Sequence, residues 1–129
     1  SRVQVEPTRD EYSRAVAFAL EDRMLSEGVR DPLYRVELSS LISIGDVAVE
    51  QNTDVTRKNV VLTTNYALYQ IDNGELVLKR RARAINAYNR VESEFANIVA
   101  ERDAIERASR QIATTIEQDL AVFFNRQGE

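Results

Sequence analysis

The chain has 129 residues with 17 Lys and Arg against 21 Asp and Glu, a net charge of −4, and neither Cys nor His. This length suits one domain with its own core, so we expect 1–129 to fold as a single domain. The mildly acidic balance argues against a nucleic-acid-binding protein, which needs a basic surface. Without Cys and His there is no thiol nucleophile, imidazole base or ordinary zinc site, and we expect no metal and no cofactor.

The sequence also lacks the motifs of catalysis and of membrane insertion. No stretch approaches the roughly 20 apolar residues that a membrane-spanning helix needs. The chain holds only four glycines and contains neither a phosphate-binding glycine-rich loop nor a nucleophile elbow. We therefore predict that the protein is not an enzyme. The catalytic alternative, an enzyme using a carboxylate pair, would need two carboxylates with raised pKa values in one pocket.

The first predicted helix occupies residues 12–25. Thr8 and Glu11 have capping-box spacing at its start, and Asp10 is an alternative cap. Apolar residues then recur at helical spacing, as expected for a helix with one buried face. Gly28 is placed to end the helix, because glycine readily adopts the left-handed conformation that follows many helices.

A longer helix is predicted near the C-terminus. Asn89 and Glu92 have capping-box-like spacing at its start. One apolar stripe then follows the helical period, and its members are Phe95, Ile98, Val99, Ile105, Ile112, Ile116, Leu120 and Phe123. The remaining positions are largely charged or polar. Glu106 and Arg110 have the i,i+4 spacing of an ion pair on a solvated helix surface.

Four segments have the patterns of strands. Residues 2–6 alternate polar and apolar side chains, and residues 33–49 place their apolar side chains mainly on one face. Residues 60–72 are rich in Val, Thr and Tyr, which suit a pleated sheet. A fourth strand is expected over 75–88.

Three segments predict turns or irregularities between these strands. Asn73 and Gly74 both tolerate positive φ, which favours a two-residue type I′ hairpin loop. The polar segment 50–59 predicts the turn of another hairpin. Gly45 and Asp46 suggest a β-bulge or kink in the second strand.

The element order β-α-β-β-β-α predicts an α+β fold. We expect a two-layer sandwich in which two amphipathic helices pack on one face of a four-stranded mixed sheet. The last three strands should form an antiparallel meander, with the first strand inserted beside or between them.

Four cations lie within five residues of the fourth predicted strand, at Lys79, Arg80, Arg81 and Arg83. Side chains alternate along a strand, so Lys79, Arg81 and Arg83 should share the face that the helices leave open and span roughly 13 Å. That length could hold two phosphates or a line of carboxylates. The alternative is a solvated face whose cations pair with cross-strand partners such as Glu37.

Several short segments between Leu62 and Phe124 carry a family resemblance. They are Leu62-Thr63-Thr64-Asn65-Tyr66-Ala67-Leu68, Asn73-Gly74-Glu75-Leu76-Val77-Leu78, Ala82-Arg83-Ala84, Ala87-Tyr88-Asn89 and Val99-Ala100-Glu101-Arg102-Asp103-Ala104-Ile105-Glu106-Arg107-Ala108. Together they resemble LptE proteins of the alphaproteobacterial type. The most specific parts are the Tyr-Asn pair before the last helix and the Ala-Glu-Arg-Asp-Ala run within it.

This resemblance implies an outer-membrane lipoprotein for lipopolysaccharide assembly, lipid-anchored on the periplasmic side through a Cys upstream of Ser1. It implies a 1:1 complex in which the domain plugs the LptD β-barrel, assists its assembly and binds lipopolysaccharide. LptE proteins are not enzymes. The alternative function is a purely structural plug and assembly factor that does not bind lipopolysaccharide directly.

The resemblance also adds candidate lipopolysaccharide contacts. In relatives, a basic residue near the turn before the third strand is linked to lipopolysaccharide binding, and Arg57 and Lys58 lie in the matching region. Arg107 is the nearest match to a basic position in the last helix. The cluster at 79–83 is denser in cations than the family leads us to expect. The candidate ligand-binding residues are therefore Arg57, Lys58, Lys79, Arg81, Arg83 and Arg107.

Overall fold

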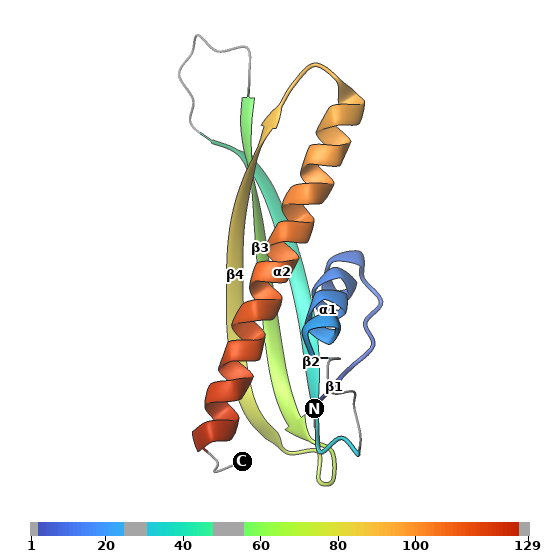
Figure 1. Cartoon of the computed structure of the whole chain (residues 1–129), viewed down its shortest axis with the longest axis vertical. Helices are drawn as coiled ribbons and strands as arrows, with labels where there is room; N and C mark the ends of the chain where they lie inside the picture. The colour runs from blue at the N-terminus through green and yellow to red at the C-terminus, as the bar shows by residue number, and fades with distance from the viewer. Residues whose placement is uncertain (1–2, 25–30, 48–55, 127–129) are drawn as a thin grey trace.

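The computed structural model describes residues 3–24, 31–47 and 56–126. In chain order its elements are β1 (Val3–Val5), α1 (Glu11–Met24), β2 (Tyr34–Asp46), β3 (Thr56–Gln70), β4 (Leu76–Arg90) and α2 (Glu94–Arg126). The predicted element order is confirmed. The molecule is long and narrow: α2 runs along most of the sheet, whereas α1 lies beside its lower part (Figure 1).

The strands form one mixed sheet in the order β1-β2-β3-β4. β1 pairs parallel to β2, and the other two pairings are antiparallel, so β1 lies at the edge and not between the later strands. Both helices pack on one face, α2 mainly against β4 and α1 against β2 and α2 (Figure 1). The predicted α+β sandwich of two helices on a four-stranded mixed sheet is confirmed.

Alternation along the strands divides the sheet into an inner face under the helices and an outer face. The inner face supplies most of the core, and its buried residues are Tyr34, Val36, Leu38, Leu62, Tyr66, Leu68, Leu78, Ala82 and Ala84. Ala82 and Ala84 have small side chains, which lets α2 pack close to β4. Within Tyr34–Asp46, the predicted division into an apolar face and a more polar face is confirmed.

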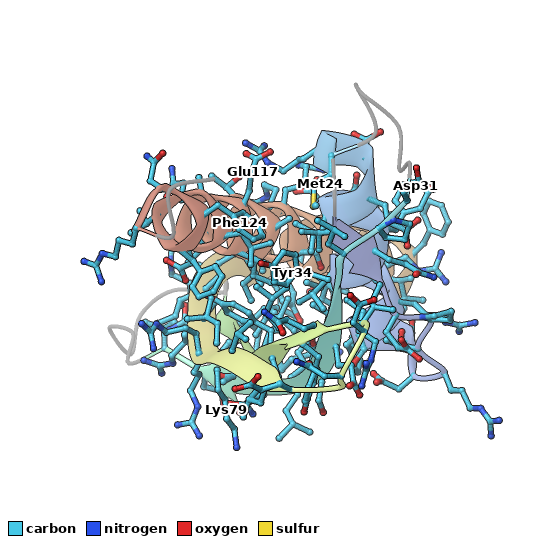
Figure 2. The ribbon with its side chains drawn as sticks, turned by 90° about the horizontal axis from the view of Figure 1, so that it is seen from below. Met24, Asp31, Tyr34, Lys79, Glu117 and Phe124 are labelled. Atoms are coloured by element: carbon cyan, nitrogen blue, oxygen red, sulfur yellow. The ribbon has the colours of Figure 1, made fainter. Side chains whose placement is uncertain are left out.

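An aromatic cluster closes the lower end of the sandwich. The ring of Tyr34 lies 5.1 Å from that of Phe124 and 6.5 Å from that of Phe123, the latter edge-to-face. Seen from below, Tyr34 lies between the sheet and the helices, and Lys79 lies on the far side of the sheet (Figure 2). Aromatic contacts of this geometry help to hold the end of α2 on the sheet.

A chain of buried polar groups joins α1 to the middle of the sheet. The N–H of Ser40 in β2 donates to Ser13 Oγ of α1 at 2.9 Å, beyond the point where β1 stops covering the β2 edge. The Ser40 hydroxyl lies 2.7 Å from Thr64 Oγ1 of β3. All three residues are buried, so these bonds replace water partners that the groups lose on folding.

Tyr66 ties the lower half of α2 to the sheet. Its ring lies in the core, as the sequence predicts, and its hydroxyl donates to Asp119 Oδ2 of α2. Burial, followed by the hydrogen bond and the negative charge of Asp119, raises the pKa of Tyr66 above its ordinary value. The phenol therefore remains a protonated donor at neutral pH.

The start of α1 differs from the predicted capping box. Asp10, the alternative cap, accepts the N–H groups of Tyr12 and Ser13 on its Oδ1 at 3.1 and 3.0 Å. Hydrogen bonds from the Ser13 hydroxyl and N–H hold the pKa of Asp10 below its ordinary value. Thr8 does not cap the helix, and its buried hydroxyl has no described partner.

The start of α2 also differs from the prediction, because Asn89 lies within β4. Ser93 caps the helix instead, with its Oγ accepting the Ala96 N–H at 3.2 Å. The Asn97 side chain bonds both backbone groups of Val91, accepting its N–H and donating to its C=O at 2.8 Å each. The Asn97 side-chain amide thus satisfies the backbone N–H and C=O of Val91, the first residue after β4, and links this residue to the first turn of α2.

The predicted apolar stripe of α2 is wrong in its first two turns. Ile112, Ile116 and Leu120 are buried, and Ile105 and Phe123 are partly buried. Phe95, Ile98 and Val99 are exposed, with 77% of Phe95 accessible. α2 begins above the top of α1, so no other described helix covers these turns (Figure 1). Helical periodicity marks apolar positions but does not show where a neighbouring helix ends.

The β3–β4 connection is longer than a type I′ loop. It spans residues 71–75, and of its residues only Gly74 has positive φ, at 69°. A register shift between Leu68 and Tyr69 accompanies this longer loop. The type I′ prediction is therefore wrong.

The other predicted irregularities have different outcomes. Gly45 pairs in register with Asn59, so the bulge expected there is wrong among the described residues. β3 begins at Thr56, earlier than predicted. Gly28 and most of the predicted turn at 50–59 lie outside the described residues.

Candidate anion-binding face

Three exposed cations form a row on the outer face of β4. Lys79, Arg81 and Arg83, hereafter the basic row, alternate with residues that face the helices. Their neighbours on β3 are the small or polar residues Ala67, Asn65 and Thr63. The predicted sharing of one face is confirmed, and no described element covers that face (Figure 1).

The basic row is not neutralised by described carboxylates. The only hydrogen bond of its side chains within the described residues joins Arg81 Nε to Asn65 Oδ1 at 3.0 Å. Glu37, the partner considered from the sequence, instead pairs with Arg35 at 3.2 Å. Arg35 also lies over the Tyr69 ring, 4.6 Å from its centroid. The Glu37 partner considered in the alternative interpretation is therefore wrong, and the three cations are exposed without a described carboxylate partner.

Arg80 belongs to a different environment. It lies on the inner side of β4, opposite Tyr66 on β3. With Asp119, Phe123 and Arg126 of α2 it lines an open hollow of about 450 Å³ at the edge of the sandwich. The four neighbouring cations of the sequence thus divide into a row of three and one residue on the other face.

Arg57 and Lys58 are adjacent in sequence but point to opposite faces of β3. Arg57 is exposed on the outer face, six residues from Thr63 and thus about 20 Å along the strand from the level of Arg83. Lys58 lies on the inner face and forms an ion pair with Asp46 of β2. The two residues therefore do not form one basic point.

Lys58 also borders the upper end of the helical side. It pairs with Tyr88 in the sheet register. Burial, followed by the charge of Glu101 on α2, raises the pKa of Tyr88, and the Lys58 cation opposes this shift. Lys58 thus acts within a local charge network and is separated from the basic row by the sheet.

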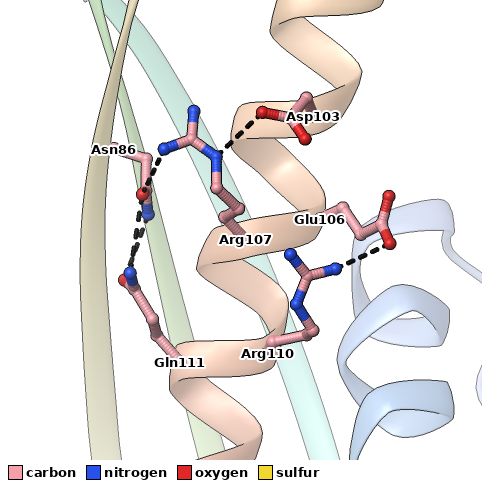
Figure 3. Close-up of polar contacts among 6 residues, drawn as sticks. All are labelled: Asn86, Asp103, Glu106, Arg107, Arg110 and Gln111. Carbon is pink, nitrogen blue, oxygen red and sulfur yellow. Dashed lines mark hydrogen bonds and ion pairs between the residues drawn. The ribbon is translucent and has the colours of Figure 1, made fainter.

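Arg107 lies on the helical side as well, held by contacts shown in Figure 3. Its Nε donates to Asp103 Oδ2 at 2.9 Å, and its Nη1 lies 3.4 Å from Asn86 Oδ1 on β4. Asn86 in turn donates to Gln111 Oε1 at 3.1 Å. Arg107 therefore helps to dock α2 on β4, and the sheet separates it from the basic row.

The charged surface of α2 otherwise matches a solvated helix. Glu106 and Arg110 form the predicted i,i+4 pair at 2.7 Å (Figure 3). They border a groove of about 720 Å³ between α1 and α2, together with the exposed ring of Phe18.

Within the described ranges, no group of three or more Asp and Glu residues is arranged to hold a metal ion. No described helix is both long and apolar enough to cross a membrane.

Two exposed apolar residues beside the basic row escaped the sequence analysis. Leu41 of β2 is 71% exposed and Ile85 of β4 is 50% exposed, both on the outer face. The signal was present, because the alternation places Leu41 on the more polar face and Ile85 next to the cations. This pattern did not predict a shared apolar surface, because the sequence does not show which strands are neighbours.

No family model matches the sequence, and no curated protein matches it significantly. Several solved structures are similar in three dimensions. A Caulobacter crescentus CB15 protein assigned to the lipoproteins matches 98% of this chain and 92% of its own, with 20% identity and a TM-score of 0.81. Rare lipoprotein B of Shewanella oneidensis matches over 98% and 97%, with 12% identity and a TM-score of 0.68. A minor lipoprotein of Acinetobacter baumannii matches over 91% of each chain, with 13% identity and a TM-score of 0.57.

These similarities establish a shared fold. The coverage of both chains is nearly complete for the first two structures, so the whole arrangement of helices and sheet is common to them. The fold that the family resemblance implied, two helices on a four-stranded sheet, is confirmed by the structure of the chain itself.

Proposed function

We propose that this protein is an LptE-like lipoprotein on the periplasmic side of the outer membrane. It would form a 1:1 complex with an LptD-type β-barrel, plug the barrel, assist its assembly and bind lipopolysaccharide during insertion. The shared fold with lipoproteins and the segments around Asn73-Gly74, Tyr88-Asn89 and 100–108 support this assignment. The observation that carries lipopolysaccharide binding is the basic row, which lacks described acidic partners.

The mechanism is electrostatic. Phosphates and acidic sugars of lipopolysaccharide would accept hydrogen bonds from Lys79, Arg81 and Arg83. Arg81 is already oriented by Asn65, which lowers the entropy lost on binding. Charge-assisted bonds of this kind contribute about 1.5–3 kcal/mol each. Because the row is exposed, salt should weaken the interaction.

The positions of the two ends of the molecule are compatible with a lipid anchor at the N-terminus. β1 and the end of α2 lie at the lower end, opposite the start of α2 (Figure 1). A lipid anchor upstream of Ser1 would tether the lower end to the membrane, and α2 would extend away from the anchor.

Reversing two charges of the row tests the proposal. We expect Arg81→Glu with Arg83→Glu to weaken binding to purified lipopolysaccharide by about tenfold or more, measured by fluorescence titration at low and moderate salt. The free energy of unfolding should stay near that of the wild type, because both side chains are exposed. The matched control is Arg14→Glu with Arg102→Glu, an equal charge change at exposed positions of the helical layer.

The affinities of these variants show whether the basic row binds lipopolysaccharide. Unchanged affinity of the Arg81/Arg83 variant would contradict the proposal, and an equal loss in the control would reduce it to an effect of net charge. Arg57→Glu should weaken binding less, because Arg57 lies far from the row. Lys58→Glu should act mainly on stability, since it breaks the pair with Asp46.

The alternative, a structural plug without direct lipopolysaccharide binding, has its own support. Phe95 and Phe18 expose large rings on the helical layer, where they could contact a barrel wall. Under this alternative the Arg81/Arg83 variant would still co-purify with LptD, and the isolated wild-type domain would show no affinity for lipopolysaccharide.

A further inference from the structure

An exposed apolar strip adjoins the basic row on the outer face. Leu41 of β2, Val61 of β3 and Ile85 of β4, hereafter the apolar strip, lie on neighbouring strands. Val61 pairs directly with Ile85, and Leu41 pairs with Thr63, the residue two positions from Val61 on the same face. Diagonal neighbours of this kind lie about 7–8 Å apart, within reach of long side chains.

The strip is not part of the described hydrophobic core. The core lies on the other face and is complete without these residues. Leu41 exposes 71% and Ile85 50% of its surface, while Val61 between them is half-buried. Leu41 and Val61 are flanked by the smaller residues Ser43 and Thr63. The strip is small, but together with its polar neighbours it offers apolar surface that part of a ligand can cover.

Charge and apolar surface meet within a short distance. Arg83 and Ile85 are two residues apart on the same face of β4, which corresponds to about 7 Å. Arg81 lies one further step along the same line. A ligand that joins an anionic group directly to an apolar chain can therefore occupy both surfaces together. A sugar polyanion would use only the cations, and an apolar peptide would leave them without partners.

We propose that the outer face recognises an acylated anion through two adjoining subsites. Arg81 and Arg83 bind the phosphate, and Leu41, Val61 and Ile85 cover part of an acyl chain. This inference rests on the proposed function and sharpens it, because it places the contact at the junction of phosphate and fatty acid. It also assigns a role to exposed apolar residues that a purely ionic site would not need.

The test compares acylated and deacylated lipopolysaccharide on the same protein variants. Leu41→Thr with Ile85→Thr removes apolar surface but keeps residues that suit a strand. The control, Phe18→Gln with Val99→Gln, removes exposed apolar surface from the helical layer. Circular dichroism and urea unfolding check the fold, and Leu41→Thr alone serves if the double variant is destabilised.

We expect the Leu41/Ile85 variant to lose about tenfold in affinity for acylated lipopolysaccharide. Its affinity for the deacylated form should equal that of the wild type. Arg81→Glu with Arg83→Glu should weaken binding to both forms, and the Phe18/Val99 control should change neither.

The outcomes separate this inference from the proposed function. If the arginine variant loses binding but the Leu41/Ile85 variant binds acylated lipopolysaccharide normally, the apolar subsite is wrong and the ionic site remains. If the arginine variant binds both forms normally, the ionic site and this inference both fail. Phosphatidylglycerol vesicles distinguish the source of the acylated anion. Equal effects of the Leu41/Ile85 variant on them would support the two subsites but assign them to anionic lipids in general, against the proposed lipopolysaccharide function.

Discussion

The two faces of the sheet are built by alternate residues of the same strands, yet they carry opposite chemistry. On the inner face, apolar side chains are sealed by the helices, and buried hydroxyls such as those of Ser40 and Thr64 bond each other. On the outer face, cations lack described acidic partners and leucine and isoleucine side chains are exposed. Substitutions on the outer face can therefore test the proposed binding with little effect on stability, because adjacent residues of a strand belong to different faces.

The largest expected contrast lies between two aliphatic residues. Leu62→Ala, at a fully buried inner position, should lower the free energy of unfolding by about 2–5 kcal/mol, because it removes core contacts and leaves a cavity. Ile85→Ala, at a half-exposed outer position, should cost less than about 1 kcal/mol. Urea unfolding of both variants measures the contrast. Equal losses would show that the outer face is also part of the core.

A smaller contrast is expected between neighbouring threonines. Thr64→Val keeps the shape of the side chain but leaves the buried Ser40 hydroxyl without its partner, at a cost of about 1–3 kcal/mol. Thr63→Val, one residue away on the outer face, should stay within about 0.5 kcal/mol of the wild type. Thermal or urea unfolding tests the pair. A harmless Thr64→Val would mean that the Ser40–Thr64 bond contributes little to the fold.

The smallest effect appears only at high pH, at Tyr66. Its pKa is raised in the folded state, so folding favours the protonated phenol. This stabilisation is complete below the ordinary pKa of 10.0 and is lost as the pH rises from there through the higher folded-state pKa. The free energy of unfolding of the wild type should therefore fall more steeply above pH 10 than that of Tyr66→Phe.

The variant Asp119→Asn separates the contribution of Asp119 to the raised pKa of Tyr66 from the contribution of burial. Burial of the ring, the largest cause of the raised pKa, remains in this variant, so part of the slope should persist. Parallel pH profiles for the wild type and Tyr66→Phe would contradict the assignment.

The sequence predicted the elements and faces that depend on periodicity. The apolar face of β2 and the position of Tyr66 in the core follow from alternation, which burial on one side enforces. Local capping and turn motifs gave wrong predictions where more than one motif or loop length fitted the same segment. Thr8 and Asp10 were both acceptable caps for α1, and the three-dimensional position of Ser13 decided between them. The Asn-Gly dipeptide indicated the hairpin, but not its five-residue loop.

The candidate site was predictable only in part, for a related reason. The basic row depends on alternation along one strand, and its placement on the open face is confirmed. Lys58 and Arg107 meet partners on other elements, Asp46 and Asn86, which only the folded chain brings near. The apolar strip crosses three strands and could be recognised only once their order and register were known.

The length of β4 has a consequence for aggregation. The strand has 15 residues without Pro or Gly, and it ends the sheet without a described neighbour on its far side. Long regular edges of this kind favour pairing between molecules, and cations along them oppose it by repulsion. Lys79, Arg80, Arg81 and Arg83 are therefore expected to disfavour pairing of this edge with another molecule. Ligand recognition and colloidal stability would depend on overlapping sets of residues.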